Sequence, residues 1–464
     1  MTLGDQVLCV DFGSTFTKVA LVDTGTGRLL GTTSHRTTID TDVLDGYDAC
    51  LAGLRERHPD VDHADVLACS SAGGGLRIAV VGNEGLVTGE AGRRVALSSG
   101  GKVVHVLALA TAPDDPMSDL IASAPDVVLL VGGTDGGNAE VLLAGARMLA
   151  GRPWPVVVAG NVDARDEVAE LLASARTPHV LADNVVPRIG VLSPGSARLA
   201  IREMFLAHVI GGKHLSERPD FTAMVRGATP DLVLTGVELL ARALGRDLAV
   251  VDVGGATTDV HSFVELDPED ASLGREVVAT APVTRTVEGD LGMRWSALST
   301  VEAGVAAGLL PDDPALADAA RVRHDDPAHL PVDATDAAYD EEIARVATVV
   351  AMRRHAGRSR VVLDAAGRVV ERTGKDLREV DLLVGSGGVL RHATPAAVLR
   401  ILGAATGTDP EGWQYPEHPE VVIDADYVLA ALGLLAADHP DAAVALGRAH
   451  LYPDGRSPPG GRST

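Results

Sequence analysis

The chain contains few aromatic residues and few cysteines. Phe, Trp and Tyr together make up 3% of its 464 residues, so its cores must be built mainly from Val, Leu and Ala. The three cysteines, Cys9, Cys50 and Cys69, form no C-x-x-C pair, and their odd number argues against a disulfide framework. Cys9 and Cys69 lie in apolar segments, where we expect buried core residues. The missing cysteine pairs weigh against an iron–sulfur or redox role.

Basic residues are also scarce. The chain has 40 Lys+Arg against 64 Asp+Glu, which gives a formal net charge of −24. Such a surface repels nucleic-acid phosphates and anionic lipids, so we expect neither nucleic acid nor a membrane as a partner. Bulk acidity does not exclude ATP, because a local nest of backbone N–H groups together with Mg²⁺ can hold a triphosphate.

Long apolar runs and metal-binding motifs are missing as well. The longest apolar helical run, residues 427–437, falls well short of the roughly 20 residues that a membrane span needs. The first residues lack the basic and apolar regions of a signal peptide, so we expect a cytoplasmic protein. No H-x-x-x-H or H-E-x-x-H pattern occurs, which disfavours a metal hydrolase. The 46% of hydrophobic residues nevertheless predicts a folded chain, and its length predicts two to four subdomains.

Alternating strands and helices are predicted for residues 100–200. Apolar strands are expected at 126–131, 156–159 and 179–182, each followed by a loop and a helix or turn. This alternation is typical of a parallel, doubly wound sheet. Further on, residues 311–340 are rich in Asp, Pro and Ala and suggest a solvated excursion, and the last helix is expected at 426–437.

The first segment with chemical potential follows an apolar strand at 7–10. The strand delivers Asp11 to the mouth of a hairpin, where Gly13 and Ser14 form a tight turn whose N–H groups can face a phosphate. Thr15, Thr17 and Lys18 add donors. Taken alone, the pattern is also compatible with an ordinary hairpin turn.

A second segment repeats this pattern about 240 residues later. The strand at 248–251 leads to Asp252, Gly254, Gly255 and then the hydroxyl residues Thr257 and Thr258. Two such hairpins suggest two related half-domains that grip phosphates from opposite sides. Asp11 and Asp252 would then be the catalytic carboxylates and would face a shared Mg²⁺ through water.

A third glycine loop follows the buried strand at 380–384. It consists of Gly385, Ser386, Gly387 and Gly388. Without Cβ atoms, the backbone of such a loop can approach a flat ligand closely. A single Gly-Ser-Gly-Gly is weak evidence, but its place after the other two segments fits an adenosine contact.

The order of these segments resembles the actin/Hsp70/sugar-kinase ATPase superfamily, with phosphate 1 at 10–18, phosphate 2 at 251–259 and adenosine at 384–389. The resemblance implies ATP and Mg²⁺ as ligands, and it places Glu288 and Gly289 near the nucleotide. Hsp70-like members carry a catalytic Glu near the start of the connecting helix. Here Gly236 takes that place and Glu238 lies two residues on, which argues against fast hydrolysis through a Glu-positioned water.

Further motifs narrow the resemblance. Residues 70–77, 131–138, 159–165, 183–190 and 285–293 look like those of the glutamate mutase accessory protein L family, also called MutL and unrelated to the mismatch-repair protein of that name. The family implies an ATP-dependent reactivating chaperone for adenosylcobalamin-dependent glutamate mutase or a related aminomutase. The implied partners are the mutase subunits. A homodimer remains open, and no tightly bound cofactor is expected.

We therefore expect an α/β protein with two ribonuclease-H-like (actin/Hsp70-type) ATPase domains and an inserted α/β domain. The expected ranges are 1–100 for the first half, 101–200 for the insertion, 201–248 for connecting helices, 249–452 for the second half and 453–464 for a disordered tail. The loop Gly132–Asn138 is either a second ligand site or a structural turn with Asn138 as the helix cap.

Two other functions remain open at this point. A small-molecule kinase of the same superfamily would need a substrate pocket and a general-base carboxylate, for which Asp259 is a candidate. A non-catalytic module would bind nucleotide without turnover. The resemblance implies a slow ATPase that acts as a reactivating chaperone.

Overall fold

The computed structural model describes residues 6–72, 75–84, 88–111, 115–265, 281–364 and 367–452. The tail expected at 453–464 lies outside this range. Within it, the chain forms three five-stranded sheets and one two-stranded hairpin. No helix in this range is both long enough and apolar enough to cross a membrane.

The first lobe is built on a mixed sheet with the strand order β10-β4-β1-β2-β3. β1, β2 and β3 are successive antiparallel strands, whereas β4 and β10 run parallel to β1. The strands are β1 (Gln6–Phe12), β2 (Phe16–Asp23), β3 (Arg28–Arg36), β4 (Asp65–Ser70) and β10 (Val225–Ala228).

The second lobe has a sheet of the same design, with the order β13-β12-β11-β16-β17. Three antiparallel strands are again followed by two that run parallel to the first. The strands are β11 (Leu248–Val253), β12 (Thr258–Phe263), β13 (Val283–Glu288), β16 (Leu382–Ser386) and β17 (Glu420–Ile423). The shared strand order and directions make the lobes two ribonuclease-H-like, actin/Hsp70-type domains, which confirms the predicted fold class.

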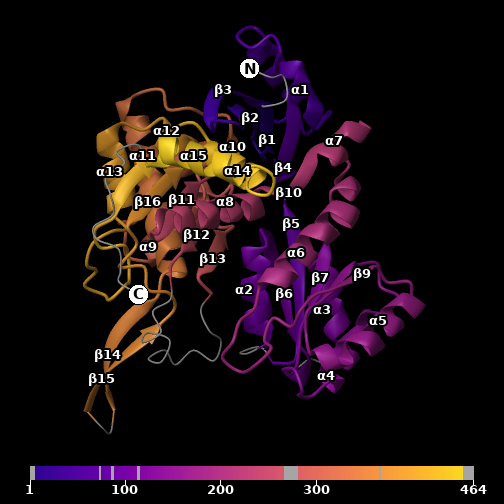
Figure 1. The fold of residues 1–464 in the computed structure, drawn as a ribbon. Coiled ribbons are helices and arrows are strands. Elements are labelled where there is room, and N and C mark those ends of the chain that lie inside the picture. Colours follow the sequence, from indigo (N-terminus) through magenta and orange to yellow (C-terminus); the bar gives the residue numbers. More distant parts are fainter. Residues whose placement is uncertain are drawn as a thin grey trace.

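The inserted domain is a wholly parallel sheet with the order β6-β5-β7-β8-β9. It interrupts the first lobe between β4 and β10 and lies below that lobe in Figure 1. Its first strand begins at Leu76, inside the range expected for the first ATPase half, so the sheet starts earlier than the expected 101. The strands are β5 (Leu76–Gly82), β6 (Gly101–Ala108), β7 (Val127–Leu130), β8 (Val156–Val158) and β9 (His179–Leu181).

Helices cover the sheets of all three units (Figure 1). The inserted domain carries α2 (Glu90–Ser98), α3 (Pro116–Ala122), α4 (Glu140–Leu149) and α5 (Arg165–Ser174). Helix α6 (Gly195–Met204) packs against β7, β8 and β9 of the inserted sheet, and the π-helical turn that follows it at Phe205–Val209 contacts β10. The first lobe carries α1 (Val43–Arg55), α7 (Pro219–Met224) and the connecting helix α8 (Thr229–Leu244). The helices after β13 are α9 (Ala297–Ala306), α10 (Pro314–Asp325), α11 (Ala334–His355), α12 (Gly388–Arg391), α13 (Pro395–Gly403), α14 (Val428–Leu435) and α15 (Pro440–Leu451). Short 3₁₀ turns occur at Val61–His63, Leu109–Thr111, Val162–Ala164 and Gly211–Lys213, and the hairpin β14 (Arg358–Asp364) and β15 (Gly367–Thr373) projects from the second lobe.

One apolar core joins the two lobes. It is formed by the facing sides of both sheets together with α8, α14 and α15. Helices α8 and α14 cross where a Cβ on Gly433 would lie 1.8 Å from the carbonyl oxygen of Leu232, so only glycine permits this approach. The three cysteines are buried and unpaired, as expected.

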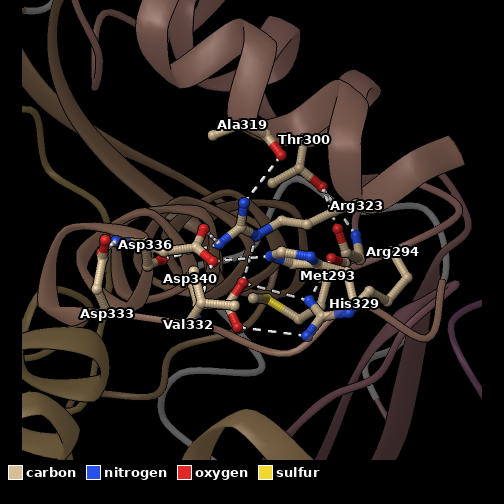
Figure 2. Close-up of polar contacts among 11 residues, drawn as sticks. Met293, Arg294, Thr300, Ala319, Arg323, His329, Val332, Asp333, Asp336 and Asp340 are labelled. Carbon is tan, nitrogen blue, oxygen red and sulfur yellow. Dashed lines mark hydrogen bonds and ion pairs between the residues drawn. The ribbon is translucent and has the colours of Figure 1, made fainter. Parts of the chain in front are cut away.

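The segment 311–340 is largely exposed, as its composition suggests, but most of it is helical. Asp313 and Asp333 cap the N-termini of α10 and α11, and Pro314 occupies the first turn of α10, so the Asp and Pro residues mark helix starts. Arg323 of α10 is fully buried and pairs with Asp336 and Asp340 of α11 (Figure 2). The prediction also missed α15, which begins with Pro440 beyond the expected last helix.

Candidate functional site

The two predicted phosphate loops have the same turn geometry. In the first, the N–H of Gly13 donates to the carbonyl of Phe16 at 3.2 Å; in the second, the N–H of Gly254 donates to Thr257 at 2.9 Å. In each turn a Cβ on the glycine would lie within 3.0 Å of that same carbonyl oxygen. Glycine is therefore required by the turn itself at both positions.

Neighbouring residues fix the direction of the second loop. Its carbonyls at Gly254 and Gly255 accept the N–H groups of Met293 and Arg294, and the carbonyl of Ala256 accepts the Ser296 hydroxyl. In a trans peptide the C=O and the following N–H point in opposite directions. The N–H groups of residues 255–257 therefore point away from the segment 293–296, as an anion-binding nest requires.

Thr37 fixes the first loop in a similar way. Its backbone N–H donates to the carbonyl of Thr15 at 2.9 Å, and its hydroxyl donates to the carbonyl of Gly13 at 2.8 Å. The N–H of Ser14, which follows Gly13 in the chain, consequently points away from Thr37. The sequence analysis overlooked Thr37, which carries no local signal.

Lys18 lies with the carboxylates at the ends of β1 and β11. Its ammonium is 3.4 Å from Asp11 Oδ2, and the Lys18 side chain remains 30% exposed. Burial alone would lower the pKa of Lys18, but the carboxylates of Asp11 and Asp252 outweigh this effect and raise it to about 12. The structure thus brings together three residues that the sequence analysis placed in one site.

This cluster has an excess of carboxylates. Burial, opposed by Lys18, raises the pKa of Asp252 to about 6, and the carboxylates of Asp259, Asp11 and Asp424 add to the shift. Burial also raises the pKa of Asp424 to about 6, although it accepts the N–H groups at the start of α14. Several carboxylates opposed by one lysine are a donor set that suits a divalent cation such as Mg²⁺.

A second partner holds Asp11 in place. The hydroxyl of Thr229, at the first position of α8, donates to Asp11 Oδ1 at 2.7 Å. Thr229 is 218 residues from Asp11 in the chain, so no sequence pattern links the two. Asp11 is only 8% exposed, and this bond ties its carboxylate to the connecting helix.

The third glycine loop is mainly a packing element. A Cβ on Gly387 would lie 2.2 Å from the carbonyl oxygen of Val253, and one on Gly385 would meet the apolar side chains of Ile423 and Leu402. Ser386 is buried, in register with Asp252. Gly388 alone has open space where a Cβ would stand. Of these four residues, Gly388 has room for a ligand beside it.

Other predicted nucleotide residues lie in different surroundings. Thr258 is fully buried in β12 and faces no open space. Glu288 pairs with Arg354 at 2.7 Å, and a Cβ on Gly289 would lie 3.3 Å from Lys102 Nζ of the inserted domain. Glu238 pairs with arginines of α6 and α8, which occupies its carboxylate. Thr258 and Glu288 therefore have structural roles. Gly289 lies where the inserted domain meets the second lobe.

The loop Gly132–Asn138 is held by hydrogen bonds to neighbouring loops. Asn138 accepts the N–H of Glu140, the first residue of α4, although the N-cap position itself belongs to Ala139 and not to Asn138 as the structural interpretation expected. Asn184 donates to the carbonyl of Gly133 and to Asp135, and Asp163 accepts the N–H of Gly136. These bonds support the structural interpretation.

A family model and a curated relative each match nearly the whole chain. A family model described as MutL protein matches residues 7–451. Protein MutL of Clostridium tetanomorphum is 36% identical over 461 residues, which covers 96% of this chain and 99% of the relative.

Solved structures align over most of the chain at low identity. Nucleotide-free acetone carboxylase aligns with a TM-score of 0.41 and 16% identity, covering 93% of this chain and 70% of the other. The ATP-dependent caprolactamase from Pseudomonas jessenii aligns with a TM-score of 0.36 and 14% identity, covering 93% and 71%. The family match and the close relative are decisive: the chain belongs to the MutL protein family.

Proposed function

We propose that this chain is an ATP-dependent reactivating accessory protein for an adenosylcobalamin-dependent mutase, either glutamate mutase or a related aminomutase. The proposal rests on membership of the MutL family and on one structural observation. Asp11, Lys18 and Asp252 from two lobes of the same design interact at matched hairpins. A ligand held between these hairpins would contact both lobes at once.

The roles of the residues follow from their positions. The N–H groups of residues 14 and 255–257 bind phosphate oxygens, and Lys18 adds a fixed positive charge. Asp11 and Asp252 would hold Mg²⁺, which neutralises charge on the phosphates when bound. Thr229 keeps Asp11 oriented from α8. Nucleotide binding thereby favours one arrangement of the lobes, and hydrolysis removes that preference.

The kinase alternative loses its candidate base in this geometry. Asp259 accepts hydrogen bonds from Arg285 at 2.6 and 3.1 Å and from Thr257 at 3.2 Å. Both carboxylate oxygens of Asp259 are thus already engaged within the protein, whereas a general base needs an oxygen in hydrogen-bond reach of the substrate hydroxyl. The non-catalytic alternative differs from the proposal in predicting ATP binding without turnover, which the following experiment measures.

The test is reactivation of an inactivated cognate mutase by the full chain. We expect recovery of mutase activity only when ATP, Mg²⁺ and free adenosylcobalamin are all present. Asp252→Asn should abolish both recovery and ATP turnover while leaving the melting temperature within a few degrees of wild type, because this carboxylate stands at a strand end. Arg321→Met, on an exposed face of α10, is the matched control.

Two outcomes would contradict the proposal. Equal recovery without ATP, or with Asp252→Asn, would remove the ATP-driven mechanism. Tight ATP binding without turnover or recovery would favour the non-catalytic alternative instead.

A further inference from the structure

A cavity of about 180 Å³ lies between the first sheet and the second lobe. Strands β1, β2 and β3 form one wall, α14 forms the opposite wall, and Arg391 at the end of α12 contributes from the second lobe. A single water needs roughly 10–15 Å³ of such volume, so the cavity has room for a small organic molecule. It adjoins the phosphate site through Asp11 and Lys18, but most of its lining has no part in that site.

The mouth of this cavity carries two cations. Lys18 Nζ lies 4.4 Å and the Arg391 guanidinium 4.5 Å from the centroid of the Tyr427 ring. A ring face attracts a cation but supplies no counter-charge. Lys18 has Asp11 as a partner, whereas no carboxylate among the described residues lies within ion-pair distance of Arg391.

The acids that also line the cavity are already engaged. Asp426 interacts with His450 at 2.9 Å, and Asp11 interacts with Thr229 and Lys18. Among the charged residues of the lining, the guanidinium of Arg391 is therefore the one without an ion-pair partner in the described part of the chain, and an anion is the ligand that complements it.

Tyr427 adopts a backbone conformation that is uncommon for its residue type. Its φ of 55° and ψ of 43° lie in the left-handed region, immediately before α14. Non-glycine residues in this region cost free energy and cluster at ligand sites. Here the conformation places the ring against both cations at the mouth.

The interior of the cavity differs from its mouth. Ala20 of β2 and Ala430 and Leu434 of α14 supply apolar surface, and β3 lines the cavity with Thr32 and Ser34, while the hydroxyl of Thr33 between them lies towards α1. A planar guanidinium pairs with a carboxylate through two parallel hydrogen bonds. We propose that this pocket binds a small aliphatic carboxylate, with its head group at Arg391 and its tail against Ala430 and Leu434.

Such a ligand would touch both lobes. The walls of the pocket come from the first lobe and from α12 and α14. The affinity of the pocket for its ligand therefore depends on how the lobes are arranged. Binding of the carboxylate would thereby change the affinity of the nucleotide site for its ligand. This last step rests on the proposed ATPase function, whereas the binding itself does not.

Titration calorimetry on the nucleotide-free full chain tests the binding separately from any ATPase activity. The probes are acetate, butyrate and hexanoate, with butylamine as the charge-reversed control and inorganic phosphate as the alternative anion. We expect affinity to rise about fourfold for each buried methylene until the cavity is filled, and butylamine not to bind. Tighter binding of phosphate than of butyrate would overturn the proposal and make the pocket a phosphate subsite.

Two variants address opposite ends of the pocket. Arg391→Met should weaken butyrate binding about tenfold or more through loss of the charged hydrogen bonds. Ala430→Leu should fill the tail region and remove the preference for butyrate over acetate. Arg321→Met is the control and should bind as wild type does. Wild-type affinity in Arg391→Met, checked for folding by its melting temperature, would also overturn the proposal.

Discussion

At the residue scale, the two hairpins that carry Asp11 and Asp252 share a sequence pattern but contribute different charges to the site. Asp11 pairs in register with Lys18 in the first hairpin, and Asp252 pairs in register with Asp259 in the second. The first hairpin therefore contributes a cation to the site. The second contributes an acid whose charge is compensated by Arg285, whose side chain is only 3% exposed. The two halves resemble each other in backbone and differ in charge.

Adjacent glycines of the third loop also differ. Gly387 has φ of 100° and no room for a Cβ beside Val253, whereas Gly388 faces open space. We expect Gly387→Ala to destabilise the protein by about 1–3 kcal/mol, because an L-residue is strained there. Gly388→Ala should leave the melting temperature unchanged. Its effect should appear in adenine-nucleotide affinity, measured by titration calorimetry.

A Cβ at Gly387 would meet the backbone of Val253, so its cost falls on stability. Unchanged stability in Gly387→Ala would contradict the packing role. A melting temperature lowered equally in both variants would show that the loop responds as a unit and that Gly388 does not face a ligand.

At the element scale, the pair α10 and α11 braces the second phosphate loop. Arg294, whose backbone N–H binds this loop, pairs through its side chain with Asp340 of α11, which also binds the buried Arg323. His329 and Arg323 both bond to Asp336 at the start of α11 (Figure 2). A mostly exposed, acidic and proline-containing segment thus supports the loop through one buried arginine and its two acid partners.

Acid should weaken the ion pairs between α10 and α11. Burial alone would raise the pKa of Asp336, but hydrogen bonds from Arg323 and His329 lower it to about 2. The folded-state pKa lies below the unfolded value of about 4, so this contribution is present above pH 4 and is lost as the pH falls towards 2. Asp336→Asn should cost about 3 kcal/mol at pH 7, since Arg323 keeps only one acid partner.

Urea unfolding at pH 7 and at pH 3 measures this effect. The difference between wild type and Asp336→Asn should shrink at the lower pH. Asp318→Asn, which removes an exposed acid of α10, is the control and should change stability by less than about 1 kcal/mol at either pH. A pH-independent difference for Asp336→Asn would contradict the assigned ion pair.

At the scale of the whole molecule, the inserted domain contacts both lobes. One continuous apolar core joins its sheet to the first lobe. On the other side, Arg285 of β13 bonds to Asp259 of the second phosphate hairpin and donates to the carbonyl of Leu97 in α2 at 3.4 Å. A single buried side chain therefore links the second hairpin to the inserted domain.

This link predicts how ATP affects the insertion. In wild type, ATP should change amide hydrogen exchange in α2. Arg285→Met should abolish that change, because it removes the bonds to both Asp259 and Leu97. Arg354→Met, which removes an arginine that pairs with Glu288 and Asp290 instead, is the control and should retain the response. An α2 response to ATP that persists in Arg285→Met would contradict the link.

The sequence by itself determined the repeating parts of this protein. An apolar strand, an aspartate, a glycine and small hydroxyl residues predict a hairpin through local rules alone, and both phosphate hairpins formed as predicted. The same holds for α8, whose end at Gly245 follows from the left-handed conformation of that residue. Local preferences and periodicity act over a few residues, so one sequence suffices to detect them.

Only the tertiary structure decided which side chains meet. Thr229 joins Asp11 from 218 residues away, and Arg323 makes a buried core element of a segment whose composition indicates solvent exposure. Whether a glycine serves a turn, a close packing contact or a ligand depends on what stands opposite it, as Gly387 and Gly388 show. Such pairings depend on long-range packing and burial, and neither leaves a periodic signal in the sequence.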